Sequence, residues 1–137
     1  ILEILHISRY KDSWPLRLSG GERQRVSIAR ALLVEPSYVM MDEPFSTLDE
    51  LTARTLRQEI IDIWQRTGVT IVFVTHSIRE ATFLADRIII LTRGPANVDD
   101  SYSVPIDRPR DYEEPRIGQV EAEIVKRVLG VWELEKT

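Results

Sequence analysis

Two carboxylates at the end of an apolar run are the first residues of this sequence that could do chemistry. Asp42 and Glu43 directly follow Tyr38–Met41, a short run that predicts a buried strand. Ligands of open α/β sheets lie beyond the carboxyl ends of the strands. Asp42 could hold Mg²⁺, largely through water, because bound Mg²⁺ keeps several waters. Glu43 could polarise an attacking water as a general base. Taken alone, an acidic turn at a strand end is an equally good interpretation, since Asp-Glu dipeptides are common.

A hydroxyl and two glycines stand at the predicted start of a helix. Ser19 and Glu22 have the S-x-x-E spacing of a capping box, and helix formers follow as far as Leu33. Gly20 and Gly21 have no side chains, so their N–H groups could approach an anion closely. The helix dipole places partial positive charge at the same point. This helix end could therefore hold a terminal phosphate, although a plain helix cap would explain Ser19 alone.

A histidine follows a second apolar run. Val69–Thr75 is rich in β-branched residues and predicts a strand that is buried on both faces. His76 would then lie at the carboxyl edge of the sheet, beside the carboxylates. Its imidazole could hydrogen-bond a γ-phosphate or the attacking water, whereas a lone histidine is more often structural. His6 has no such setting, and we assign it no function.

Two further capping boxes predict the helices between these strands. Thr47 and Glu50 form one of them, and Gly68 stands where the C-terminal cap of that helix belongs. Ser77 and Glu80 form the other, at the start of a short helix. The first of these helices has an apolar face at helical spacing, made of Leu56, Ile60, Ile63 and Trp64.

The alternation of helices and apolar strands predicts an α/β fold. Arg87–Thr92 is a third apolar run, followed by the turn Arg93-Gly94-Pro95, so we expect about three parallel strands with helices on their faces. Ser101–Ile106 predicts an edge strand, and Pro115 begins a last helix. We expect residues 1–95 to form one domain and 96–137 an extension. The apolar face of the last helix carries Ile117, Val120, Ile124 and Val128.

The composition of the sequence excludes several classes of protein. The 137 residues suit one compact domain, and 43% of them are apolar, which is enough for a core. The net charge of -4 argues against nucleic acid as the main partner. There are no cysteines, which excludes disulfides and Cys-based zinc sites. No apolar run approaches the roughly 20 residues of a membrane-spanning helix. The sequence begins with Ile1 inside an apolar stretch, from which we expect a truncated chain.

The order of these features resembles the nucleotide-binding subunits of ABC transporters. Leu18–Gln24 is similar to the signature motif of that family, and Val39–Glu43 to its Walker B motif with the catalytic glutamate. Ser46–Asp49 is similar to the D-loop and His76 to the switch histidine. The resemblance covers nearly the whole chain, and this combination of motifs is specific.

Within the family, the chain most resembles importers of the nitrate, sulfonate and taurine type. It departs from many members at two positions, since Glu22 replaces a glutamine and Thr47 an alanine. The segments that carry the importer resemblance are Phe45–Asp49, Val74–Ala81, Phe83–Arg87 and Ile106–Asp111.

The resemblance implies an ATP site shared by two subunits of a homodimer. One subunit supplies the P-loop, Walker B motif and switch histidine, and the other supplies the signature motif. The implied roles are catalysis for Glu43 and His76, Mg²⁺ binding for Asp42, and ATP binding for Ser19, Gly20, Gly21, Glu22 and Asp49.

One part of that site is missing from this sequence. A P-loop requires G-x-x-x-x-G-K-[ST], and no glycine here is followed by Lys and then Ser or Thr. The implied fold is thus a partial P-loop-NTPase-like sheet that lacks the N-terminal Walker A portion. We expect a parent ATPase that drives solute import with a transmembrane permease subunit, at the cytoplasmic face of the cell membrane. The chain alone would be catalytically incomplete and, with apolar sheet surface exposed, would self-associate.

Two other classes of protein remain open. A short regulatory module could pair with intact ABC ATPase subunits without hydrolysing ATP. A P-loop directly upstream in the reading frame would indicate truncation, whereas a start codon near Ile1 would favour the regulator. A DNA-repair or chromosome-organising ABC ATPase would have similar motifs, but such proteins usually contain long heptad segments, and the sequence has none. The sequence does not name the solute.

Overall fold

The computed structural model describes residues 1–92 and 97–134, with only the backbone of 131–134. It divides into two compact units, which are described separately: unit 1, Ile1–Val74, and unit 2, Thr75–Thr137. The expected boundary after residue 95 and the expected turn Arg93-Gly94-Pro95 fall on residues 93–96, outside the described residues.

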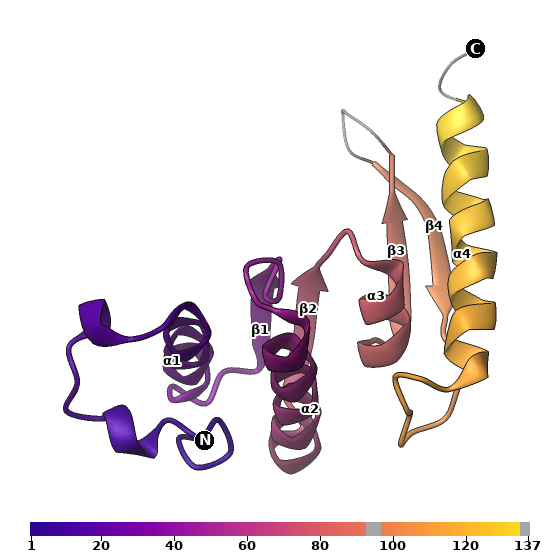
Figure 1. The fold of residues 1–137 in the computed structure, drawn as a ribbon. Coiled ribbons are helices and arrows are strands. Elements are labelled where there is room, and N and C mark those ends of the chain that lie inside the picture. The colour runs from indigo at the N-terminus through magenta and orange to yellow at the C-terminus, as the bar shows by residue number, and fades with distance from the viewer. Residues whose placement is uncertain (93–96, 135–137) are drawn as a thin grey trace. The chain divides into compact units, whose positions relative to one another are not determined.

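Unit 1 combines two strands with two long helices. β1 and β2 pair in parallel, with Tyr38 opposite Thr70 and Asp42 opposite Val74. α2 is the crossover that a parallel pair requires. The predicted α/β class is confirmed. The elements of unit 1 are η1 (Ser8–Tyr10), η2 (Pro15–Arg17), α1 (Gly20–Leu32), β1 (Tyr38–Asp42), α2 (Glu50–Thr67) and β2 (Thr70–Val74) (Figure 1).

Local sequence signals define most ends of the helices in unit 1. Ser19 and Glu22 form the predicted capping box of α1, because each side chain accepts a hydrogen bond from the backbone N–H of the other. Gly68 ends α2 as predicted, with φ of 65° in the left-handed region that glycine adopts without strain.

The start of α2 differs from the prediction. Its N-cap is Asp49, whose Oδ1 accepts the N–H of Thr52 at 3.0 Å, so the assignment of Thr47 was wrong. Consecutive hydrogen-bonded turns over residues 43–48 precede the helix. The helix begins only after Asp49, whose side chain caps its first turn.

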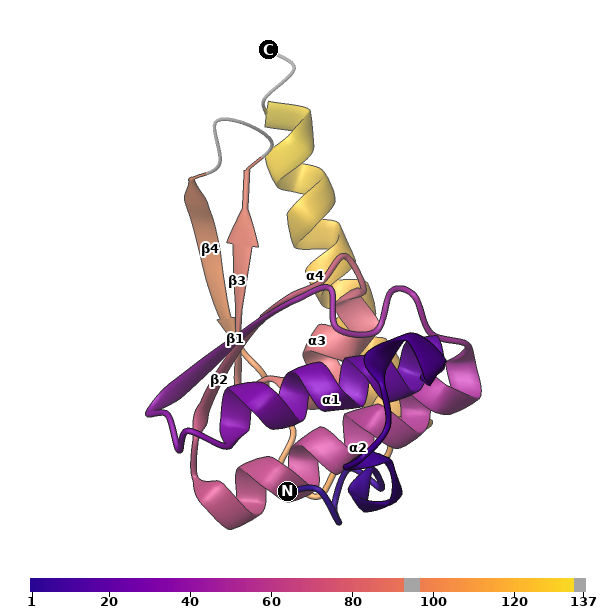
Figure 2. The ribbon, with the colours of Figure 1, turned by 90° about the vertical axis from the view of Figure 1, so that its left-hand side faces the viewer.

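The two helices of unit 1 lie side by side, joined by an ion pair (Figure 2). Arg25 Nε donates to Glu59 Oε2 at 2.9 Å and Arg25 Nη2 to Glu59 Oε1 at 3.2 Å, and Glu59 is buried. The largest fully buried side chains of unit 1 are Leu5, Leu56 and Ile63.

The sheet of unit 1 has one buried and one exposed face. Val39 and Met41 are buried, whereas Tyr38 and Met40 are exposed. The expectation that the second strand is buried on both faces was wrong, because residues of β2 alternate between exposed and half-buried. β2 pairs with β1 alone among the described strands, which explains its exposure.

Unit 2 is a hairpin with two helices. β3 pairs antiparallel with β4, a pairing that the sequence analysis did not predict. The connection between β3 and β4 is too short for the crossover that parallel strands need. That β3 also runs parallel to the strands of unit 1 stays a prediction. The predicted edge strand exists but runs from Val98 to Ser103 rather than from Ser101 to Ile106. The elements of unit 2 are α3 (Ile78–Leu84), β3 (Arg87–Leu91), β4 (Val98–Ser103) and α4 (Pro115–Leu134).

The core of unit 2 lies between the hairpin and α4 (Figures 1 and 2). The predicted apolar face of the last helix is confirmed: Ile117, Val120 and Ile124 are buried, and Val128 packs against them. They meet Ile90 of β3 and other apolar side chains of the hairpin. No helix within the described part of either unit is long and apolar enough to cross a membrane.

Candidate functional site

The N-terminus of α1 has the open backbone that the sequence predicts. Ser19 and Gly20 are exposed, and a Cβ added to Gly20 would meet nothing within 4 Å. The N–H groups of Gly20 and Gly21 belong to the first turn, where a helix offers no carbonyl acceptor. This end of α1 can therefore receive an anion.

A tyrosine that the sequence analysis did not identify holds the Glu22 carboxylate. The Tyr10 hydroxyl donates to Glu22 Oε1, and Ser19 N donates to Glu22 Oε2 at 2.8 Å. These hydrogen bonds, that of Tyr10 above all, hold the pKa of Glu22 below its usual value. The same contact raises the pKa of Tyr10. No sequence spacing indicates that the partner of Glu22 lies twelve residues upstream.

Gly21 lies at a close packing contact between α1 and α2, whether or not its N–H group binds an anion. A Cβ at this position would lie 3.0 Å from Thr52 Cγ2 and 3.8 Å from Leu48 Cδ2. Real Cβ atoms essentially never approach closer than 3.0 Å. The missing side chain therefore lets the start of α1 rest on the start of α2, and this joins two of the predicted site segments.

The two carboxylates lie at the carboxyl end of the parallel pair. Asp42 ends β1 opposite Val74, and its side chain is exposed. Glu43 is half-buried and has φ of 45°, a left-handed conformation that is uncommon for a residue with a side chain. Its N–H donates to Val74 O at 2.9 Å, which ties the strained residue to β2. Backbone strain of this kind concentrates at functional sites.

Asp42 fits a magnesium ion that is shared with a nucleotide. Among the side chains of residues 1–92 and 97–130, no three of His, Cys, Asp or Glu form a cluster that could hold a metal. Mg²⁺ needs no such cage, because it binds through one or two carboxylates, waters and substrate phosphates. An exposed carboxylate at a strand end is that kind of ligand.

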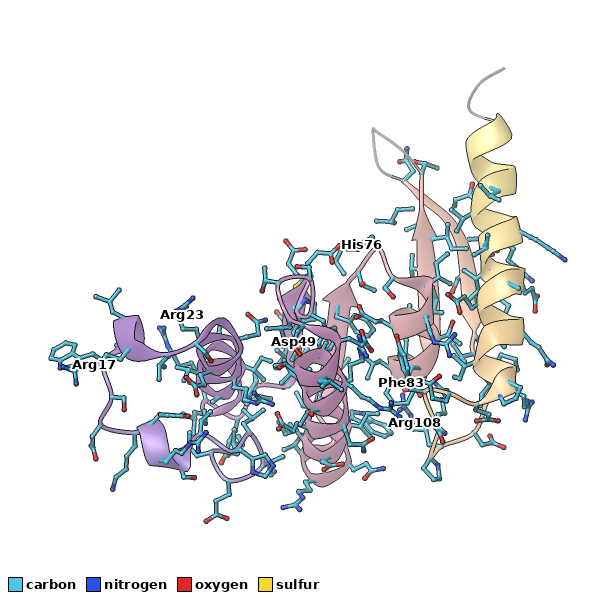
Figure 3. The ribbon with its side chains drawn as sticks, viewed as in Figure 1. Arg17, Arg23, Asp49, His76, Phe83 and Arg108 are labelled. Atoms are coloured by element: carbon cyan, nitrogen blue, oxygen red, sulfur yellow. The ribbon has the colours of Figure 1, made fainter. Side chains whose placement is uncertain are left out.

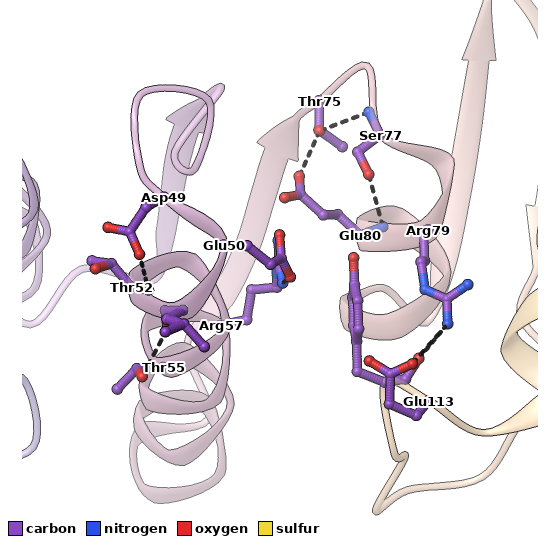
Figure 4. A network of polar contacts seen from close by, with 12 residues as sticks. Asp49, Glu50, Thr52, Thr55, Arg57, Thr75, Ser77, Arg79, Glu80 and Glu113 are labelled. Atoms are coloured by element: carbon purple, nitrogen blue, oxygen red, sulfur yellow. Dashed lines mark hydrogen bonds and ion pairs between the residues drawn. The ribbon is translucent and has the colours of Figure 1, made fainter.

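Asp49 and His76 occupy the starts of two helices (Figures 3 and 4). The exposed Asp49 caps α2, and hydrogen bonds from Thr52 hold the pKa of Asp49 below its usual value. His76 is exposed just before Ser77, the N-cap of α3. Asp49 belongs to unit 1 with the carboxylates, and His76 belongs to unit 2. That His76 lies beside the carboxylates stays a prediction.

Comparison with known proteins supports the resemblance. The ABC transporter family matches residues 1–46, which include the open end of α1 and both carboxylates. The nitrate import ATP-binding protein NrtD of Synechococcus elongatus is 41% identical over 127 residues, which are 89% of this chain and 46% of that protein. The aliphatic sulfonates import ATP-binding protein SsuB 1 of Streptomyces avermitilis is 44% identical over 125 residues, 91% of this chain and 47% of that protein.

A solved structure extends the similarity to the fold. It is a dimeric ATP-binding cassette in a post-hydrolysis state, bound to ADP and Pi. It is 34% identical to this chain with a TM-score of 0.63, over 77% of this chain and 46% of that one. This chain thus spans about half the length of the curated relatives that it matches.

Proposed function

The chain resembles the ATP-binding subunits of ABC transporters in sequence and fold, and from this premise we propose that it is part of the ATP-hydrolysing subunit of an ABC importer. The solute class is that of the nitrate, sulfonate and taurine importers. One observation carries the proposal. A single compact unit contains both an open helix end at Ser19–Gly21 and a carboxylate pair at the end of a parallel strand.

In the proposed mechanism the residues of this chain serve two ATP sites. The N–H groups of Gly20 and Gly21, with the Ser19 hydroxyl, bind the γ-phosphate of a nucleotide that the partner subunit holds. Asp42 would hold Mg²⁺, which would supply positive charge beside the phosphates. Glu43 orients and polarises the attacking water, and His76 hydrogen-bonds the γ-phosphate. Asp49 lies in the segment that faces the partner subunit.

The partners follow from this division of the site. The subunit acts as a homodimer, because its signature motif serves the nucleotide of the other copy. It couples to a transmembrane permease and is bound peripherally at the cytoplasmic face of the membrane. The 137 residues contain no P-loop, so hydrolysis needs a P-loop from outside this sequence.

Mg²⁺-dependent ATP hydrolysis by this chain, beside a Glu43→Gln variant, tests the proposal. We expect no turnover by either protein alone. After a P-loop-bearing upstream segment is joined to the chain, we expect turnover that Glu43→Gln reduces by about 10²-fold or more. Turnover by the chain alone that disappears in Glu43→Gln would mean that it binds phosphates without a P-loop. Persistent inactivity with a P-loop present would contradict the proposed function.

A further inference from the structure

Hydrogen bonds of Thr75 and Ser77 hold the backbone on either side of His76 (Figure 4). His76 itself is exposed. Thr75 Oγ1 accepts the N–H of Ser77 at 3.0 Å, so one side chain spans the histidine. The same hydroxyl donates to Glu80 Oε2 at 2.8 Å. His76 is thus an exposed residue between two neighbours, Thr75 and Ser77, that are hydrogen-bonded to each other.

Glu80 joins this turn to the helix behind it. Its N–H donates to Ser77 Oγ at 3.2 Å, which is the N-cap contact of α3. Glu80 is buried, since only 8% of the residue is exposed. A buried carboxylate requires hydrogen bonds, because burial without them is costly. Thr75 supplies one of them, so Thr75 and Glu80 hold each other in place.

Contacts of Arg79 anchor the first turn of α3 to the rest of unit 2. Arg79 Nη1 donates to Glu121 Oε2 of α4 at 3.2 Å, and Arg79 Nη2 donates to Tyr112 O at 2.8 Å. The guanidinium also lies 5.0 Å from the centre of the Tyr112 ring. Glu113 contributes a further carboxylate 3.8 Å from Arg79. The turn that presents His76 therefore rests on a helix that is fixed within its unit.

We propose that Thr75 and Glu80 are positioning residues for His76, holding its backbone so that the imidazole meets the γ-phosphate without further ordering. This inference rests on the proposed function, in which His76 contacts the nucleotide. Neither Thr75 nor Glu80 touches the substrate itself. Their contribution is to the geometry of the reacting complex, so their loss lowers kcat more than it raises KM for ATP.

The test uses the ATPase subunit in which this sequence is joined to its P-loop. Thr75→Val keeps the shape of the side chain and removes the hydroxyl. We expect kcat to fall on the order of 10- to 100-fold with KM changed less than about 2-fold, because small misplacements at a reacting centre have effects of that size. Thr75→Ser restores the hydroxyl and should recover most of the activity. Glu80→Ala removes the acceptor of the Thr75 hydroxyl and should lower kcat in the same way, which provides a second variant if Thr75→Val folds poorly.

A matched control and a direct structural measurement separate positioning from general destabilisation. Thr55 is an exposed residue of α2 whose hydroxyl donates to Leu51 O. Thr55→Val removes this hydroxyl and should leave kcat unchanged. Amide hydrogen exchange at Ser77, measured by NMR in the 137-residue chain, should be faster in Thr75→Val than in the unmodified chain. In Thr75→Ser it should match the unmodified chain.

Three outcomes would overturn the inference. If His76→Ala abolishes hydrolysis while Thr75→Val and Glu80→Ala match the unmodified subunit, the positioning role is wrong and the proposed function stands. If Thr75→Ser fails to recover what Thr75→Val loses, the hydroxyl is not the cause. If His76→Ala hydrolyses ATP normally, the role of His76 in the proposed function fails together with the inference.

Discussion

The glycines at the start of α1 have different reasons for lacking a side chain. Gly20 faces open space, whereas Gly21 leaves room for the Thr52 methyl group. The motif resemblance treats the two residues alike, as groups that let a phosphate approach. The packing shows that Gly21 also lies in a tight contact between α1 and α2.

Alanine at each position should separate these roles. Gly20→Ala should raise the free energy of unfolding by up to about 1 kcal/mol, because alanine restricts the unfolded chain and favours the helix. Gly21→Ala should be less stable than Gly20→Ala by about 1 to 3 kcal/mol, since its Cβ overpacks against Thr52. Urea unfolding of the 137-residue variants measures both. Thr52→Ser in the Gly21→Ala background removes the clashing methyl and should recover stability; no recovery would assign the loss to another cause.

Some site residues could be predicted from sequence because their signals are local. The Ser19–Glu22 capping box spans three residues and is found as predicted. Tyr10 could not be predicted as the partner of Glu22, because only the fold brings an irregular upstream segment to that helix end. The left-handed backbone of Glu43 also has no signal, since sequence marks such positions mainly by glycine.

At the scale of elements, the carbonyl groups at the end of α3 accept hydrogen bonds from side chains of a distant segment. Arg110 is buried, and its Nη1 lies 3.0 Å from Thr82 O, 3.2 Å from Phe83 O and 2.7 Å from Ala85 O. Burial lowers the pKa of Arg110, but a guanidinium stays protonated in proteins. Arg108 donates to Leu84 O as well (Figure 3 shows its place in the fold). The carbonyls that a helix leaves unpaired at its C-terminus are satisfied here by arginines.

Arg110→Met should therefore loosen α3. We expect a loss of about 2 to 3 kcal/mol in the free energy that protects α3 amides from hydrogen exchange, because buried carbonyls lose a charged donor. Arg116→Met is the matched control, since Arg116 makes one exposed hydrogen bond to Pro105 O, and its effect should stay within about 0.5 kcal/mol. Equal effects of the two substitutions would show that the buried contacts of Arg110 stabilise α3 no more than the exposed hydrogen bond of Arg116 does.

The pairing of elements was harder to predict than their existence. The apolar run at Arg87–Leu91 is a strand as its composition indicates, yet its antiparallel partner was missed. The polar sequence of β4, with Asp99 and Asp100, resembles a loop more than a strand. α2 shows competition between two local signals, since Thr47 and Asp49 are both good N-cap residues and the structure uses the second.

At the scale of the molecule, unit 1 exposes an apolar patch on its sheet. Tyr38 and Met40 of β1 are 65% and 71% exposed. Val72 pairs with Met40, and Val74 follows on the same face of β2, at 46% and 52% exposure. A flat apolar face on a two-stranded sheet is a surface on which other chains can pack.

The chain should consequently self-associate. Light scattering over a dilution series should show a mass that rises with protein concentration. Met40→Lys, which places a charge in the middle of the patch, should shift the mass toward that of a monomer. Leu51→Lys on α2 changes a comparably exposed residue outside the sheet and should have little effect. A monomeric mass at every concentration would contradict this prediction.

The arginines that terminate α3 have a consequence for biosynthesis. During translation the helix leaves the ribosome before the arginines at 108 and 110, whose hydrogen bonds reach back 24 to 28 residues. Ile117 and Ile124, which complete the core over the hairpin, emerge later still. The core of unit 2 is therefore complete only after its last helix has been made. A nascent chain that stalls before α4 would leave the apolar side chains of the hairpin uncovered and open to chaperones.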